Sequence, residues 1–194
     1  MEPRLAFVKS PVWEQADADT QQGFAELVEH LGDIAYEVEL SEAFAPVVGW
    51  HQTVMESELA RSFAKEYQRG ADKLSSQLVE MIERGMKYSA VEYLNALNPR
   101  TALREILASI FDECDAIITP AATGEAPKGL ESTGSPVFCT LWTYLGLPCI
   151  TLPLLQGSHG LPMGVQLVGP MMDDARLLRT ARWLWRYLAD PGSE

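Results

Sequence analysis

Hydrophobic residues near the start of the chain change their spacing twice. Residues Leu5 to Val8 form a continuous apolar run, which is typical of a buried strand. Apolar residues then recur at the spacing of one helix face, and the helix is expected to end at Gly32. Residues 35–40 alternate apolar and acidic side chains, as a half-buried strand does. The pattern predicts a β-α-β unit over residues 4–40.

Residues 42–114 have helical periodicity throughout and are interrupted only by Gly70, Gly85 and Pro99. Ser89 and Glu92 have the spacing of a capping box, in which each side chain satisfies a free backbone amide at the start of a helix. The last helix of this segment carries an apolar stripe that we expect to lie in the core. Its members are Leu103, Ile106, Leu107, Ile110, Phe111 and Cys114.

Residues 115–190 return to strand patterns and then to a helix. A buried strand is predicted at 116–118, ending at Thr119 and Pro120, and a segment rich in glycine and proline follows it over 121–136. Two further strands, 149–154 and 163–168, are joined by a turn, and Asp173 caps the closing helix. Together the three segments predict a single α/β domain over residues 1–194.

Composition narrows the range of partners. The net charge of −12 and the pI near 4.7 disfavour binding to nucleic acid or to anionic membranes, both of which need clustered lysine and arginine. The sequence has no signal peptide pattern and no apolar stretch of the roughly 18 residues that would span a bilayer. The three cysteines lack CxxC spacing, so we interpret them as reduced core thiols in a cytoplasmic protein.

The glycine- and proline-rich segment and the strand end before it are the best candidates for a ligand pocket. Strand ends and glycine-rich loops commonly form clefts in α/β folds. The candidate substrate-binding residues are Thr119, Pro120, Thr133, Gly134, Phe138 and Trp142. The alternative is that the glycines and prolines only shape turns. Gln166, a polar residue inside an apolar strand, needs a hydrogen-bond partner if it is buried.

Several blocks in register resemble the carboxy-terminal region of amidase-signature hydrolases. They are residues 115–121, the pairs 126–127, 129–130 and 133–134, and then 142–148 and 160–169, continuing to Asp174, Leu177 and Leu178. Similarity at 7–13 and 93–97 is weaker. The resemblance covers essentially the whole chain. It implies an α/β fold with a mixed sheet covered by helices, and the hydrolysis of carboxylic amides without a metal or another cofactor.

The resemblance also implies a catalytic apparatus that this sequence does not match. Family members use a serine nucleophile, a second serine on a cis peptide bond, a lysine, and backbone amides that hold the oxyanion. The sequence contains no Gly-Gly-Ser-Ser-Gly run, and no lysine follows the family's pattern. Its one adjacent serine pair, Ser75–Ser76, lacks flanking glycines and fits a helix N-cap. No catalytic residue is therefore assigned.

Other catalytic arrangements find no support in the sequence. The three histidines, His30, His51 and His159, are not accompanied by a Gly-x-Ser-x-Gly elbow, which a serine triad on this kind of fold would need. Nor does His51 belong to a His-Glu-x-x-His motif, so no metal site is predicted.

Three functional hypotheses follow. In the first, the chain is the carboxy-terminal part of an amidase and is inactive alone; an exposed strand edge and apolar face would then favour self-association. In the second, the missing amino-terminal half, or a separate polypeptide carrying the serine-rich loop, completes the site for a small-molecule amide. In the third, the chain is a ligand-binding or interaction module without catalysis.

Overall fold

The computed structural model describes residues 2–189, with the side chain of the last one left out. The chain divides into two compact units. One contains the described residues up to Ala45 and those from Leu103 onward, and the other is Pro46–Ala102. Each helix within residues 2–189 is too short or too polar to span a bilayer.

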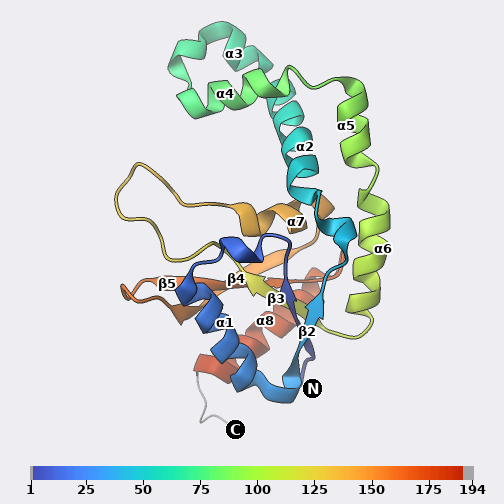
Figure 1. Ribbon diagram of the computed structural model, residues 1–194, viewed down its shortest axis with the longest axis vertical. Helices are drawn as coiled ribbons and strands as arrows, with labels where there is room; N and C mark the ends of the chain where they lie inside the picture. The colour runs from blue at the N-terminus through green and yellow to red at the C-terminus, as the bar shows by residue number, and fades with distance from the viewer. Residues whose placement is uncertain (1, 190–194) are drawn as a thin grey trace. The chain divides into compact units, whose positions relative to one another are not determined.

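The larger unit is built on a five-stranded sheet with the order β2-β1-β3-β5-β4 (Figure 1). Its strands are β1 (Leu5–Lys9), β2 (Ala35–Glu39), β3 (Ala116–Pro120), β4 (Cys149–Gln156) and β5 (Pro162–Val168). β1 pairs in parallel with β2 and β3, whereas β5 pairs antiparallel with both β3 and β4. The predicted α/β fold with a mixed sheet is therefore confirmed.

The predicted β-α-β unit is present, and its helix has the expected ends. α1 (Ala18–Leu31) begins after Asp17, whose carboxylate accepts a hydrogen bond from the amide of Thr20 at 2.8 Å. It ends at Gly32, where φ is +51°, a conformation that residues with a Cβ rarely adopt. Helix periodicity and end signals were enough to predict this unit because they are local.

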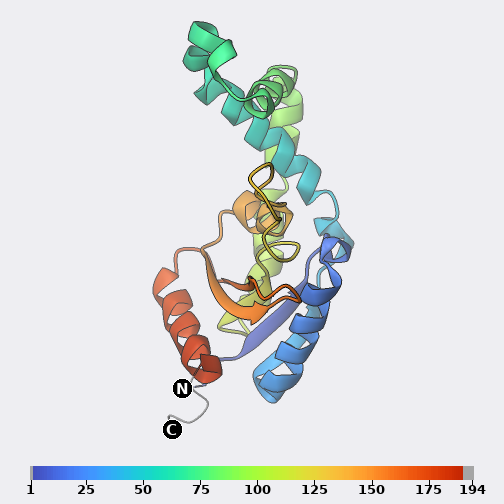
Figure 2. The ribbon, with the colours of Figure 1, turned by 90° about the vertical axis from the view of Figure 1, so that its left-hand side faces the viewer.

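Two helices share one face of the sheet. α1 and α8 (Asp174–Ala189) lie side by side there, and the rings of His30 and Tyr187 are 6.0 Å apart (Figure 2). The core beneath them combines residues of β1, β3 and β5 with one stripe of each helix. Its central members are Leu5, Phe7, Phe24, Leu27, Ile118, Val165, Leu167, Leu177 and Leu184.

The smaller unit is helical. It contains α2 (Val47–Ser62), α3 (Ala64–Gly70), α4 (Ser76–Gly85) and α5 (Ala90–Leu97), and α6 (Arg100–Phe111) begins within it. Ser75 caps α4 by accepting from the amide of Leu78 at 3.3 Å, so its expected role as an N-cap is confirmed. The capping box of Ser89 and Glu92 is also present at the start of α5.

The structure differs from the sequence-based expectations in three places. The helix α7 (Val137–Leu145) was not predicted. Ile106 was assigned to the core, but its side chain is exposed on α6. Cys149 was also assigned to the core and is exposed on β4, whereas Cys114 is buried as expected. Burial raises the pKa of the Cys114 thiol to about 11 and keeps it protonated at neutral pH.

Candidate functional site

The carboxyl ends of β1 and β3 meet at one edge of the sheet because the two strands are parallel. The hydroxyl of Thr119 donates to the carbonyl of Val8 at 3.1 Å and links the two strand ends. Thr119 is completely buried, and the neighbouring Pro120 is buried too. Ligands of open α/β sheets are commonly found at such an edge. Two of the predicted site residues therefore lie at an edge where ligands often bind.

Gln166 on β5 contributes a polar side chain to the same place. It pairs across the sheet with Thr119 and is buried. Its side-chain amide donates to the carbonyl of Pro120 at 3.4 Å, which supplies the partner that a buried glutamine needs. This contact also fixes the end of β3.

Helix α7 brings Phe138 to this edge and carries Trp142 on the same face. The two residues are one helical turn apart, and both are buried. Phe138 packs against Val12 and Ala16, which follow β1 in the chain. In the first turn of the helix, the thiol of Cys139 lies 3.5 Å from the carbonyl oxygen of Ala121, just after β3. The amino-terminal half of α7 therefore contacts the segments that leave both strands.

The other end of α7 is held by an arginine. The Nε of Arg104, on α6, donates to the carbonyl of Leu145 at 2.7 Å. Gly146 follows with φ +68° and ends the helix in the left-handed conformation. A guanidinium at this position satisfies a free carbonyl and complements the partial negative charge at the end of the helix. Arg104 therefore contacts the carboxy-terminal end of the helix that carries Phe138 and Trp142.

Two buried polar atoms, one after β1 and one on α7, have no hydrogen-bond partner among the described residues. They are the indole Nε1 of Trp142 and the hydroxyl of Ser10, the residue that follows β1. Leaving a buried polar group unpaired costs about 1–3 kcal/mol, so such groups usually bind water or a ligand. Sequence reasoning missed Ser10, although a polar residue directly after a buried strand was a usable signal.

The remaining predicted site residues, Thr133 and Gly134, lie elsewhere. Both are exposed in the long loop between β3 and α7 (Figure 1). Gly134 has φ +85°, and its amide donates to the hydroxyl of Ser132 at 3.1 Å, which is a local turn contact. The structure therefore places Thr119 and Pro120 at the strand end and Phe138 and Trp142 on the adjoining helix, and it leaves the other two in the loop.

A second polar cluster lies at the turn between β4 and β5. The carboxylate of Glu125 accepts from the amide of Leu161 at 2.8 Å and lies 2.9 Å from Nδ1 of His159. The hydroxyl of Ser158 approaches the same nitrogen at 3.5 Å. A serine relay needs the serine and the carboxylate on different ring nitrogens. This cluster therefore fastens the turn and does not form a triad.

The cluster also fixes the base of the long loop. A Cβ on Gly157 would lie 2.5 Å from the side chain of Glu125, and one on Gly124 would lie 1.7 Å from Asp17. The amide of Asp17 donates to the carbonyl of Thr123 at 2.8 Å. Residues 123–125 are thus packed between the start of α1 and the β4–β5 turn. Within residues 2–189, no cluster of histidine, cysteine, aspartate and glutamate is arranged to hold a metal ion.

The profile of the Amidase family matches residues 2–178. One of the curated relatives, a glutamyl-tRNA(Gln) amidotransferase subunit of Hyphomonas neptunium, is 32% identical over 135 residues, covering 64% of this chain and 26% of that protein. The corresponding protein of Cupriavidus necator is 39% identical over 101 residues, covering 48% of this chain and 20% of its own length.

A solved structure shows the same fold. A crystal structure of an amidase, 25% identical in sequence, matches 97% of this chain with a TM-score of 0.82. The matched region makes up 46% of that protein. The chain therefore spans about a quarter or less of the two curated relatives and less than half of the solved amidase.

Proposed function

Because the chain belongs to the amidase family, we propose that it supplies part of the substrate pocket of an enzyme that hydrolyses carboxylic amide C–N bonds. The observation that carries this proposal is the family match over residues 2–178. The substrate is a small-molecule amide, and no cofactor takes part. A cytoplasmic location is part of the proposal and is supported by the three free cysteines.

Catalysis in this proposal comes from outside these 194 residues. Serine is a weak nucleophile at its ordinary pKa and needs a base and preorganised donors for the oxyanion. Residues 1–194 contain no glycine-flanked serine pair, and Ser75 is used as a helix cap. The serine, the cis-peptide serine and the lysine are therefore supplied by the rest of an amidase fold, in the same polypeptide or in a separate one.

The part of the pocket that we assign to this chain is the edge formed by Thr119, Pro120, Phe138 and Trp142, with Thr133 and Gly134 in the adjoining loop. Its chemistry suits an amide. A carboxamide offers a carbonyl oxygen as an acceptor, and the unpartnered indole N–H of Trp142 is a buried donor. The hydroxyl of Ser10 can both donate and accept.

The test is a measurement of ammonia release from a panel of primary amides. The chain alone is expected to release none, and the chain produced together with the serine- and lysine-bearing part of an amidase from the same genome is expected to be active. Hydrolysis by the chain alone would contradict the proposal. Amide binding by the joint preparation, without hydrolysis, would instead favour the non-catalytic binding module.

Within the active preparation, Trp142→Phe tests the pocket assignment. The substitution removes the N–H and keeps an aromatic ring, so KM for the amide is expected to rise about tenfold, which corresponds to the loss of one hydrogen bond of about 1.4 kcal/mol. Trp185→Phe, at a partly exposed position on α8, is the matched control. Equal KM values for the two variants would remove Trp142 from the pocket.

Self-association is a further part of the proposal, and the unpaired edge of β4 supports it. Among the described residues, β4 pairs only with β5, so its other edge presents unpaired backbone groups. Size-exclusion chromatography with light scattering is expected to show oligomers that Thr151→Lys on β4 reduces, because a charged edge opposes strand pairing. Thr101→Lys, at an exposed position on α6, is the control. A monomeric parent chain would contradict this part.

A further inference from the structure

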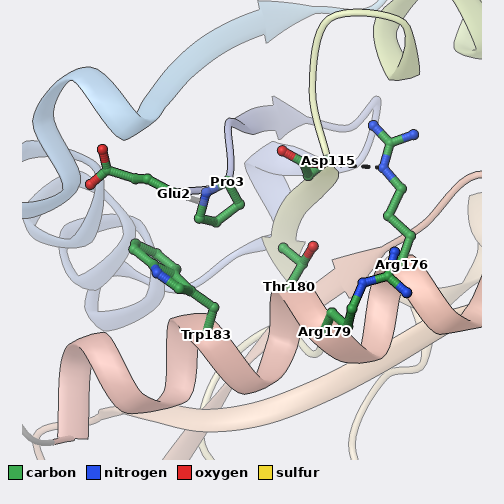
Figure 3. A pocket seen from close by; sticks show the side chains of 7 residues that line it. All are labelled: Glu2, Pro3, Asp115, Arg176, Arg179, Thr180 and Trp183. Carbon is green, nitrogen blue, oxygen red and sulfur yellow. Dashed lines mark ion pairs between the residues drawn. The ribbon is translucent and has the colours of Figure 1, made fainter.

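A pocket of about 330 Å³ lies between the start of β1 and helix α8, in the larger unit (Figure 3). Glu2 and Pro3 line it from the segment before β1, and Asp115 lines it from the residue before β3. Arg176, Arg179, Thr180 and Trp183 line it from α8. Their spacing along α8 puts them on one face of the helix. The volume is sufficient for a small organic molecule.

At one end of the pocket, an ion pair is held in place by hydrogen bonds to the backbone. Arg176 forms an ion pair with Asp115, with Nε and Oδ1 3.4 Å apart, and it also donates to the carbonyls of Phe111 and Cys114. Asp115 accepts from the amide of Arg4 at 2.9 Å. These contacts use both charges of the Arg176–Asp115 pair, so neither residue is available as the main contact for a ligand.

Two other charged side chains line the pocket, and their charges are not paired within the described residues. Among the described residues, Arg179 and Glu2 have no hydrogen-bond or ion-pair partner. Figure 3 shows Arg179 at the same end as Arg176, and Glu2 at the opposite end above Trp183. Thr180 lies between the two ends. The pocket therefore presents an unpaired cation at one end and an unpaired carboxylate beside an indole at the other.

From this charge distribution we propose that the pocket binds an elongated zwitterion, such as an ω-amino acid. Its carboxylate contacts the guanidinium of Arg179, which suits a planar anion. Its ammonium group lies between the carboxylate of Glu2 and the ring of Trp183, which attracts a cation through its π face. The ring of Trp183 stacks on Tyr187 at 4.8 Å, which holds it in place. This inference does not depend on the proposed amidase function.

Isothermal titration of the full chain with three probes of equal length tests the proposal. The first probe, ε-aminocaproate, carries both charges. The second, caproate, carries only the carboxylate, and the third, hexylamine, carries only the ammonium group. Loss of one charged contact is expected to weaken binding about tenfold. ε-Aminocaproate should therefore bind more tightly than either other probe. Equal affinities, or no saturation by ε-aminocaproate up to about 10 mM, would overturn the proposal.

Variants identify the two ends. Arg179→Gln is expected to weaken binding of ε-aminocaproate about tenfold and to leave hexylamine binding unchanged. Glu2→Gln should also weaken binding of ε-aminocaproate but leave caproate binding unchanged. Arg182→Gln, an exposed residue of the same helix that does not line the pocket, is the matched control. Thermal unfolding of each variant verifies that it folds. If Arg179→Gln and Arg182→Gln bind the zwitterion equally well, the assignment of the anionic end is wrong.

Discussion

The guanidinium of Arg84, on α4, donates to the buried carboxylate of Glu56, on α2, through both Nε and Nη2, with Nη2 2.7 Å from Oε1. The two sides of this pair differ. Glu56 is 1% exposed, whereas the side chain of Arg84 is 46% exposed. Gln52 and Tyr88 also donate to the same carboxylate. The helical unit therefore contains a buried charge whose cationic partner reaches solvent.

This asymmetry predicts unequal effects of the two single substitutions. Arg84→Ala leaves the Glu56 carboxylate buried without a cation and is expected to destabilise the unit by about 1–3 kcal/mol, the cost of an unsatisfied buried group. Glu56→Gln should cost less, because the glutamine carbonyl still accepts from Arg84, which can also hydrate. Urea unfolding of both variants measures the difference. A larger loss for Glu56→Gln would contradict the prediction.

Gly85 allows α4 to approach α2 closely. A Cβ at this position would lie 2.0 Å from the carbonyl oxygen of Glu56, which is backbone and cannot rotate away. Gly85→Ala is therefore expected to force the two helices apart and to destabilise the unit by about 1–3 kcal/mol.

Gly49, inside α2, is the matched control for Gly85. A Cβ there would meet nothing within 4 Å. Gly49→Ala should stabilise the unit by about 0.5–1 kcal/mol, because alanine is the better helix former. The two free energies of unfolding should therefore change in opposite directions. Destabilisation by both substitutions to the same degree would show that the close contact is not the cause.

Asp19, near the start of α1, links that helix to the β4–β5 turn. The backbone amide of Ser158 donates to its carboxylate at 2.7 Å and lowers the pKa of Asp19 below its usual value. A carboxylate with a lowered pKa stabilises the fold above its usual pKa, near 3.9, and loses that contribution as the pH falls through the lower, folded-state pKa. The contact should therefore persist at neutral pH and break in acid.

An NMR titration of the Ser158 amide measures this transition. Its midpoint should lie below about pH 3.9, and Asp19→Asn should abolish it because the side chain no longer titrates. A midpoint above that value in the parent protein would exclude the amide contact as the cause.

Arg104 is predicted to hold the end of α7. Arg104→Met keeps most of the aliphatic stem and removes the donor to the Leu145 carbonyl. The expected cost is about 1–2 kcal/mol, so amide exchange in residues 137–145 should accelerate about tenfold. Hydrogen exchange with mass spectrometry measures this, with Arg182→Met on α8 as the control. Unchanged exchange in α7 would remove Arg104 from its positioning role.

Local sequence signals were sufficient to predict a helix where capping residues mark its ends. Asp17 and Gly32 frame α1, and Ser89 and Glu92 start α5, because caps act within one helical turn. α7 has an end signal in Gly146, but its N-cap residue, Pro136, has no side chain that can cap the start. Six of its nine residues, including Phe138 and Trp142, are buried, so it lacks the polar face that makes a helix recognisable. The prediction that Ile106 is buried was wrong because Ile106 fits the apolar stripe of α6 but the packing leaves its side chain exposed.

Sequence patterns alone predicted the α/β class, the β-α-β unit and the family resemblance. They also selected Thr119, Pro120, Thr133, Gly134, Phe138 and Trp142 as pocket candidates. Three-dimensional packing was needed to place Ser10 at the edge with an unpartnered hydroxyl, to separate Thr133 and Gly134 from it, and to bring Glu2 into one pocket with Arg179. The difference lies in the range of the interactions. Periodicity and caps act between residues a few positions apart, whereas strand pairing and burial join residues that the sequence keeps far apart.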